Sequence, residues 1–132
     1  MRREYYDLYQ KRLTEFIARL ARTDMVSAQA PVEAVCRVSD EPISFAERRG
    51  AAKNYRAIAV GEVWGSAWQS AWFHLRGQVP AAWRGNDVAL RFDANGESLV
   101  FDDHGCPVYG LTNGSVFDGA FHKDLYRLYE PC

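Results

Sequence analysis

Four tryptophans are the residues of this sequence whose side chains are best suited to contact a ligand. An indole stacks its face on the apolar face of a sugar ring, so each is a candidate carbohydrate or interface contact: Trp64, Trp68, Trp72 and Trp83. The alternative is a core or interface role, since a tryptophan buries on the order of 200 Å². Because a spacing of four through a turn and a strand need not give one common face, we favour the core and interface interpretation.

The acidic, histidine and cysteine residues do not form a catalytic pattern. Glycosidases need two carboxylates facing each other across the sugar, and metal hydrolases need three or four converging ligands. Asp102 and Asp103 are neighbours on an expected strand, so their side chains point to opposite faces. His104 has only Cys106 nearby, and a turn histidine beside a small thiol explains that pair equally well. We therefore expect no catalytic residue and no metal site in this segment.

The balance of charge argues against several kinds of partner. Sixteen basic residues face seventeen acidic ones, which leaves no field to attract phosphate backbones or anionic lipid. Nucleic acid and membrane are therefore not expected partners. Three cysteines at unrelated spacings suggest a reducing compartment, and the charged start MRREYYDLYQKRL lacks the apolar run of a secretory signal. We expect a cytoplasmic protein.

The first 54 residues are predicted to form a helix and a connector. From Arg3 to Arg22, apolar residues recur every three or four positions, as on one face of an amphipathic helix. Residues 24–54 mix prolines and glycine with short apolar pieces and are predicted to wrap across a neighbouring surface. Within them, Ser44 and Glu47 match a capping box that starts one brief helix.

Residues 55–132 are predicted to form an antiparallel β-sandwich segment. Apolar and polar residues alternate there, most clearly from Ala71 to Arg76. Asn95-Gly96 predicts a type I′ hairpin turn. Counting outward from it places four apolar side chains on one buried face: Leu90, Phe92, Leu99 and Phe101. Further turns are expected at residues 102–105 and 112–114, and a last strand at 125–130. The fold class is mainly β, a jelly-roll-like (galactose-binding-like) antiparallel sandwich with an N-terminal amphipathic helix, all in one body.

A combination of short motifs gives this segment a family likeness. They are Trp64-Gly65 ahead of Trp72-Phe73, Val79-Pro80 with Trp83 and Gly85, Gly96-Glu97 leading to Val100, and Gly105, Pro107 and Gly110-Leu111. With them, the chain resembles the amino-terminal β-sandwich of the α-mannosidases of glycoside hydrolase family 38, in the cytosolic and vacuolar branch. The expected helix at residues 3–22 also resembles the helix that opens those proteins.

The resemblance implies a role within a larger enzyme. In that family, zinc and the nucleophilic aspartate lie in a separate β/α barrel, and the sandwich has further strand or strands after the point equivalent to Leu128. The resemblance therefore implies a non-catalytic structural and assembly domain of a zinc-dependent retaining enzyme that hydrolyses terminal α-mannosides. Its expected partners are the remaining domains, with a homo-oligomer or an oligosaccharide as additional candidates. The alternatives are an independent carbohydrate-binding module and a stand-alone hydrolase.

Overall fold

The computed structural model describes residues 3–23, 26–48, 54–114 and 122–128. It divides into two compact units, Met1–Pro31 and Val32–Cys132. The first contains α1 (Arg3–Thr23), which confirms the predicted helix. Its apolar stripe is exposed, as Leu8, Leu13 and Phe16 illustrate. Lys11 and Glu15, one turn apart on the polar side, lie 4.0 Å from each other.

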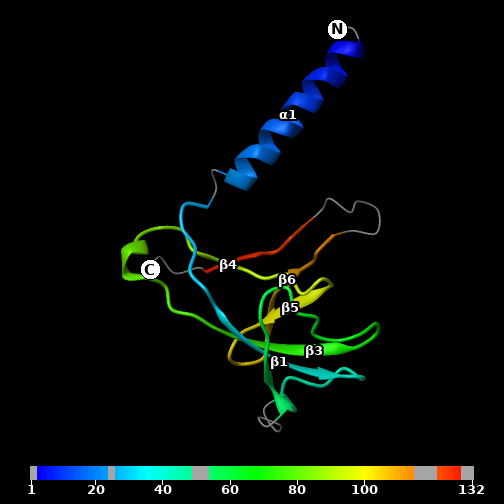
Figure 1. Cartoon of the computed structure of the whole chain (residues 1–132), viewed down its shortest axis with the longest axis vertical. Helices are drawn as coiled ribbons and strands as arrows, with labels where there is room; N and C mark the ends of the chain where they lie inside the picture. Colours follow the sequence, from blue (N-terminus) through cyan, green and yellow to red (C-terminus); the bar gives the residue numbers. More distant parts are fainter. Residues whose placement is uncertain (1–2, 24–25, 49–53, 115–121, 129–132) are drawn as a thin grey trace. The chain divides into compact units, whose positions relative to one another are not determined.

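The second unit begins with a three-stranded antiparallel sheet in the order β2-β1-β3 (Figure 1). Its members are β1 (Glu33–Ser39), β2 (Arg56–Ala57) and β3 (Ser70–Arg76). In the register of β1 with β3, Cys36 lies opposite Phe73. The central position of β1 explains why Cys36 is fully buried.

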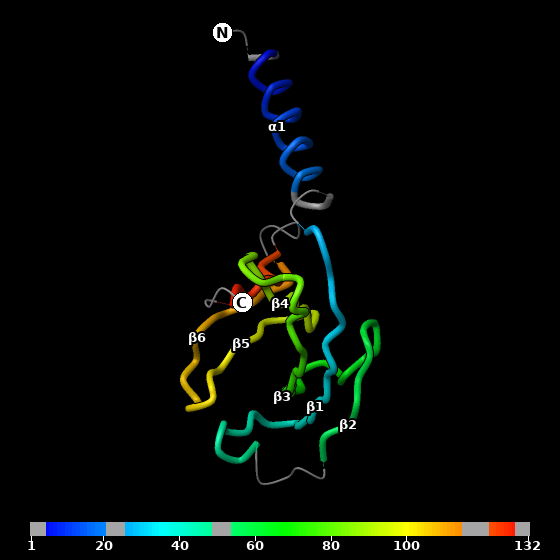
Figure 2. Tube along the Cα trace, turned by 90° about the vertical axis from the view of Figure 1, so that its left-hand side faces the viewer, coloured from blue at the N-terminus to red at the C-terminus, as the bar shows by residue number. Residues whose placement is uncertain are grey.

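The remaining strands form two antiparallel pairs, β4-β7 and β5-β6. Figure 2 shows β5 and β6 running side by side. The strands are β4 (Ala89–Arg91), β5 (Ser98–Phe101), β6 (Pro107–Leu111) and β7 (Leu125–Arg127). Reciprocal backbone hydrogen bonds between Thr112 and Lys123, at 2.8 and 3.0 Å, join the end of β6 to the start of β7. The spatial order is therefore β5-β6-β7-β4, and the mainly antiparallel β prediction is confirmed.

Several sequence predictions differ from this fold. The segment predicted as a wrapping connector, residues 24–54, contains the central strand β1. Its prolines concealed this, because Pro31 precedes the strand and Pro42 follows it without interrupting it. Within the same segment the capping-box contacts of Ser44 and Glu47 do form, but they close a single turn rather than a helix.

The predicted hairpin at Asn95-Gly96 is wrong, because β4 pairs with β7 and β5 pairs with β6. A type I′ turn needs positive φ at both central residues, and only Asn95 (φ 57°) has it. Asp93 Oδ1 instead accepts the Asn95 N–H at 2.7 Å, a local bond that turns the chain away from a two-residue hairpin.

The predicted apolar face of that hairpin is correct at three of its four positions. Leu90, Phe92 and Phe101 are half-buried, whereas Leu99 is 62% exposed. The pairing with β6 sets the orientation of β5 independently of β4. Leu99 lines an open groove, which leaves its side chain exposed. The turn expected at residues 102–105 does connect β5 to β6, and the last expected strand is β7, with residues 129–130 outside the described part of the chain.

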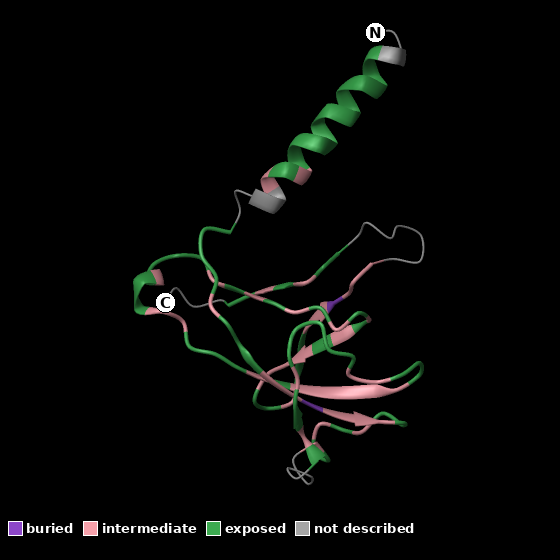
Figure 3. Cartoon of the chain, viewed as in Figure 1, coloured by how far each residue is buried: buried purple, intermediate pink, exposed green. Residues whose placement is uncertain are grey.

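Few side chains in the described part of the chain are fully enclosed. Cys36 and Leu111 are the two hydrophobic residues that count as buried there, at 1% and 3% exposure, and Figure 3 shows correspondingly little buried chain. A domain of this size normally encloses a larger core. The sandwich is therefore open on its inner side.

Substituting the buried thiol tests the apolar character of this small core. Cys36→Ser places a hydroxyl where the surroundings are apolar, and we expect it to lower the free energy of unfolding by about 1–3 kcal/mol. Cys36→Ala, which only removes the sulfur atom, serves as the control and is expected to cost less. Urea unfolding of both variants measures the difference. A serine variant as stable as the alanine variant would contradict an apolar environment around Cys36.

Candidate functional site

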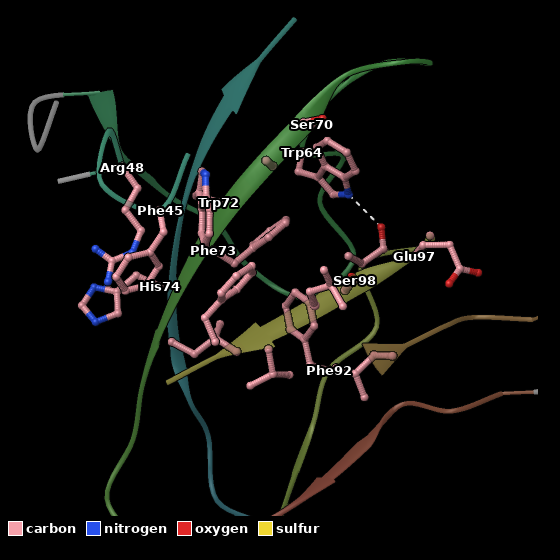
Figure 4. Close-up of a pocket in the computed structure, with 18 of the residues that line it drawn as sticks. Phe45, Arg48, Trp64, Ser70, Trp72, Phe73, His74, Phe92, Glu97 and Ser98 are labelled. Atoms are coloured by element: carbon pink, nitrogen blue, oxygen red, sulfur yellow. Dashed lines mark hydrogen bonds between the residues drawn. The ribbon is translucent and has the colours of Figure 1, made fainter. Parts of the chain in front are cut away.

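The second unit contains a groove of about 1530 Å³, which we call the aromatic groove (Figure 4). It is lined from both sets of strands: β3 contributes Trp72, Phe73 and His74, and the opposite side contributes Phe92 and Phe101 among others. Small-molecule pockets usually measure roughly 300–1,000 Å³. The groove is thus larger than one sugar requires.

Three rings form the first cluster on the groove wall. Trp72 on β3 lies 5.0 Å from Phe101 on β5 and 6.0 Å from Phe45, centroid to centroid. Phe45 and Phe101 are 5.8 Å apart, which closes the triangle. The indole Nε1–H of Trp72 donates to the carbonyl oxygen of Ile43 at 2.9 Å, so the ring is held at both its apolar and its polar side.

The turn at residues 44–47 positions Phe45 and Arg48. Ser44 Oγ donates to Glu47 Oε2 at 2.6 Å, and the Ser44 N–H donates to the same oxygen at 2.8 Å. The hydroxyl of Ser44 and then its backbone N–H lower the pKa of Glu47 from its ordinary 4.5. The Arg48 guanidinium carbon lies 3.5 Å from the Phe45 ring centroid, a cation–π contact on the groove wall.

A second cluster of rings centres on Phe73, the residue that follows Trp72 in β3. Phe73 makes edge contacts with Trp64 at 5.9 Å and with Phe92 at 5.1 Å. The indole Nε1–H of Trp64 donates to the carbonyl oxygen of Ala94 at 2.8 Å, the bond drawn in Figure 4. These contacts connect the three-stranded sheet to the segment after β4.

The turn between β5 and β6 packs against the first cluster. The backbone N–H groups of Cys106 and His104 donate to Asp102 Oδ1 at 2.8 and 3.0 Å. Chiefly the bond from Cys106 lowers the pKa of this carboxyl from its ordinary 3.8. Gly105 has a φ of +93°, and a Cβ there would lie 2.5 Å from the Phe45 ring. A glycine is therefore required for the turn to approach this ring.

The structure does not bring the four candidate tryptophans together. Trp64 and Trp72 line the aromatic groove as half-buried anchors. Trp83 is half-buried at the end of the short helix η2 (Ala81–Trp83), and its backbone N–H donates to the carbonyl oxygen of Pro80. Trp68 is 97% exposed with a φ of 69°, a conformation that costs a non-glycine residue about 1–3 kcal/mol. Neither of these two lines the groove.

The metal-binding chemistry considered for the β5–β6 turn finds no support in its geometry. His104 Nε2 lies 3.4 Å from Asp103, both side chains are exposed, and Cys106 is exposed as well. No group of three or more histidine, cysteine, aspartate or glutamate side chains converges within the described ranges. The described residues therefore do not fit a zinc site, and we derive no chemical step through one.

Sequence analysis missed Phe45 and Arg48 as parts of the groove. They lie in the segment predicted as a connector, where a single phenylalanine gives no periodic signal. The Ser44–Glu47 capping box was the available clue, because it fixes the turn from which both side chains project. Phe92 was expected to be buried, but its contact with Phe73 was not predicted.

The close approach of Gly105 to Phe45 predicts an unequal response of two turn glycines. Gly105→Ala introduces both a clash at 2.5 Å and positive-φ strain, so we expect a loss of about 2–4 kcal/mol in unfolding free energy. Gly96→Ala is the matched control, since a Cβ at Gly96 meets nothing within 4 Å and its φ is not positive. Thermal unfolding of both variants checks this; equal stability of the two would contradict it.

The lowered pKa of Asp102 predicts a pH-dependent contribution to stability. Because the folded-state pKa lies below 3.8, the charged carboxylate stabilises the fold above that pH, and the contribution is lost as pH falls through the folded value. Asp102→Asn keeps an acceptor oxygen without the charge. We expect the urea midpoint of the wild type to exceed that of the variant at pH 7, and the difference between the two midpoints to be smaller at pH 3. A difference of unchanged size would refute a stabilising role for the charge of Asp102.

Comparison with known proteins gives the family of the chain. The family described as "Alpha-mannosidase, jelly roll domain" (Ams1-like) matches residues 30–125. Alpha-mannosidase 2C1 of Homo sapiens is 32% identical over 108 residues, covering 77% of this chain and 10% of that protein. Alpha-mannosidase 2C1 of Mus musculus is 33% identical over 79 residues, covering 60% of this chain and 8% of that protein.

Other findings bear on the same question. No solved structure matches the chain. Within the described residues, no helix has the length and apolar character that crossing a membrane requires. The chain spans about a tenth of the length of the curated relatives it matches. Because one family model matches residues 30–125, which is most of the chain, the chain belongs to the α-mannosidase jelly-roll domain family.

Proposed function

We propose that this chain is a non-catalytic structural and assembly domain of an α-mannosidase, and that its aromatic groove packs against another part of that protein. The observation that carries the proposal is the groove itself: about 1530 Å³ of open space lined by aromatic rings. Protein interiors are close-packed, with few voids larger than a water molecule. Space of this size between two sets of strands is therefore suited to be filled by polypeptide.

The edges of the sheets support the same proposal. Among the described strands, β3 pairs only with β1, and β5 pairs only with β6. Both β3 and β5 line the aromatic groove, so each offers unpaired backbone groups beside it. An edge strand readily accepts a further strand, which adds main-chain hydrogen bonds while its side chains enter the neighbouring cavity.

The relatives support a proposal for the activity of the whole protein. The curated relatives are α-mannosidases about ten times as long as the matched segment, which leaves ample chain for a separate catalytic region. We propose that the whole protein hydrolyses terminal α-mannosides in the cytoplasm with zinc bound in that catalytic region. In this proposal, the exposed stripe of α1 is a second surface for packing against the remaining domains or a neighbouring subunit.

A carbohydrate-binding module is the second candidate function. The observation in its favour is Trp68, whose indole is 97% exposed and free to stack on a sugar. The groove tryptophans favour it less, because the N–H groups of Trp64 and Trp72 are already bonded to backbone carbonyls.

A titration of the isolated chain with mannose and mannobiose separates these two functions. If the domain serves assembly, we expect tryptophan fluorescence to change by no more than the linear solvent effect up to tens of millimolar sugar. Saturable quenching in the millimolar range would instead favour the carbohydrate-binding module. Turnover of nitrophenyl α-mannoside by the isolated chain with added zinc or cobalt would contradict a non-catalytic role.

A further inference from the structure

The loop between β2 and β3, residues 58–69, exposes three apolar side chains that do not line the aromatic groove. Val60 is 106% exposed, Val63 81% and Trp68 97%. None of the three lines the groove. Isolated exposed apolar residues are common, but three on one short loop are typical of a surface that meets another molecule.

Side-chain hydrogen bonds brace the backbone of this loop. Arg56 Nη2 donates to the carbonyl oxygens of Val63 at 3.0 Å and Trp64 at 3.3 Å. At the other end, Gln69 Nε2 donates to Asp40 Oδ1 at 2.7 Å, which ties the loop to the segment after β1. The exposed side chains are therefore presented from a pre-organised backbone.

Two turns in the loop share one backbone feature but differ in the residue that adopts it. In the turn at residues 59–62, the third position has a φ of +88° and is Gly61. In the turn at residues 66–69, the third position has a φ of +69° and is Trp68. A positive φ at this position is the mark of a type II turn and is suited to glycine. Trp68 thus adopts a strained conformation while its side chain gains almost no burial in return.

We infer that Trp68 is an anchor by which this domain docks on another part of the α-mannosidase polypeptide, its indole entering an apolar pocket there. The inference rests on the proposed function, since it takes the partner to be the rest of that protein. Strain held at a residue without local compensation indicates a function elsewhere. Tryptophan is among the residues most enriched at the energetic centres of protein interfaces.

The chemistry of the loop favours a protein partner over a sugar. Glu62 is the one ionisable residue in positions 58–69, and its carboxylate accepts the Ala59 N–H at 2.8 Å. The other exposed large apolar side chains of this loop are two valines, which offer no hydrogen bonds to sugar hydroxyls. A mainly apolar loop with a braced backbone matches an apolar protein pocket.

The size of the surface favours a partner within the same polypeptide over a second copy of the chain. Together Val60, Val63 and Trp68 offer on the order of 500 Å². Stable complexes between separate proteins bury about 800 Å² on each partner, whereas interfaces between domains of one chain bury roughly 600–1,500 Å² in total, which is about 300–750 Å² on each side. Linkage in one polypeptide supplies a high effective concentration, so the smaller surface suffices.

Trp68→Gly tests this inference by comparing two contexts. In the 132-residue chain alone, the substitution removes strain and loses no packing, so we expect the melting temperature to rise by about 3–5 °C. In the full-length α-mannosidase polypeptide, it removes the anchor, so we expect the melting temperature of this domain to fall by about 3 °C or more and limited trypsin digestion to be faster. The reversal of sign between the two contexts is the predicted result.

Asn95→Gly is the matched control, because Asn95 is the other described non-glycine residue with positive φ, at 57°. We expect its shift to have the same sign in both contexts. A fall in melting temperature on Trp68→Gly in the chain alone would overturn the inference, as would a rise in both contexts. Mannobiose could also quench the tryptophan fluorescence of the wild-type chain but not that of Trp68→Gly. That result would overturn the inference in favour of a sugar site. Lack of mannoside hydrolysis by the full-length polypeptide would refute the proposed function, while the sign of the shifts would still decide the role of Trp68.

Discussion

The fold depends on the contact of Trp72 with Phe45 and Phe101, because these rings join elements that share no strand pairing. Trp72 belongs to β3, Phe101 to β5, and Phe45 to the turn after β1. Strand pairing holds each sheet together but does not join one sheet to the other. Aromatic ring contacts make that connection, in this cluster and between Phe73 and Phe92. Since these rings meet only along part of the interior, the aromatic groove beside them stays open, and this opening is the basis of the assembly role that we propose.

Much of the fold was predictable from periodic patterns. The helix at residues 3–23 and the strand at 70–76 follow from spacings that local chemistry fixes. The pairing of β4 with β7 was not predictable, because it joins residues 34 positions or more apart and no local signal specifies the partner. Asn95-Gly96 was the clearest local signal for a hairpin, but the hairpin does not form. The Asn95 N–H instead donates to Asp93, and β5 pairs with β6 rather than with β4.

The candidate site was predictable in its residue types but not in its arrangement. The core interpretation of the tryptophans is consistent with the half-buried positions of Trp64 and Trp72. In such a position, a large amphipathic ring contacts an apolar surface while its N–H reaches a carbonyl acceptor. The separation of Trp68 from them could not be predicted, because it depends on a positive φ that no residue-type preference for tryptophan suggests. Phe45 was overlooked for a similar reason: its place against Gly105 arises from two turns far apart in sequence.

Hydrogen–deuterium exchange provides the most direct test that another part of the protein completes the aromatic groove. The measurement compares the backbone amides of β3 and β5 in this chain alone and in the full-length α-mannosidase polypeptide. Our account predicts that amides at the unpaired edges of these two strands exchange at least tenfold more slowly in the full-length protein, since a packed segment both pairs with them and excludes water. Equal exchange in the two contexts would contradict it, because the groove would then remain open in the assembled enzyme.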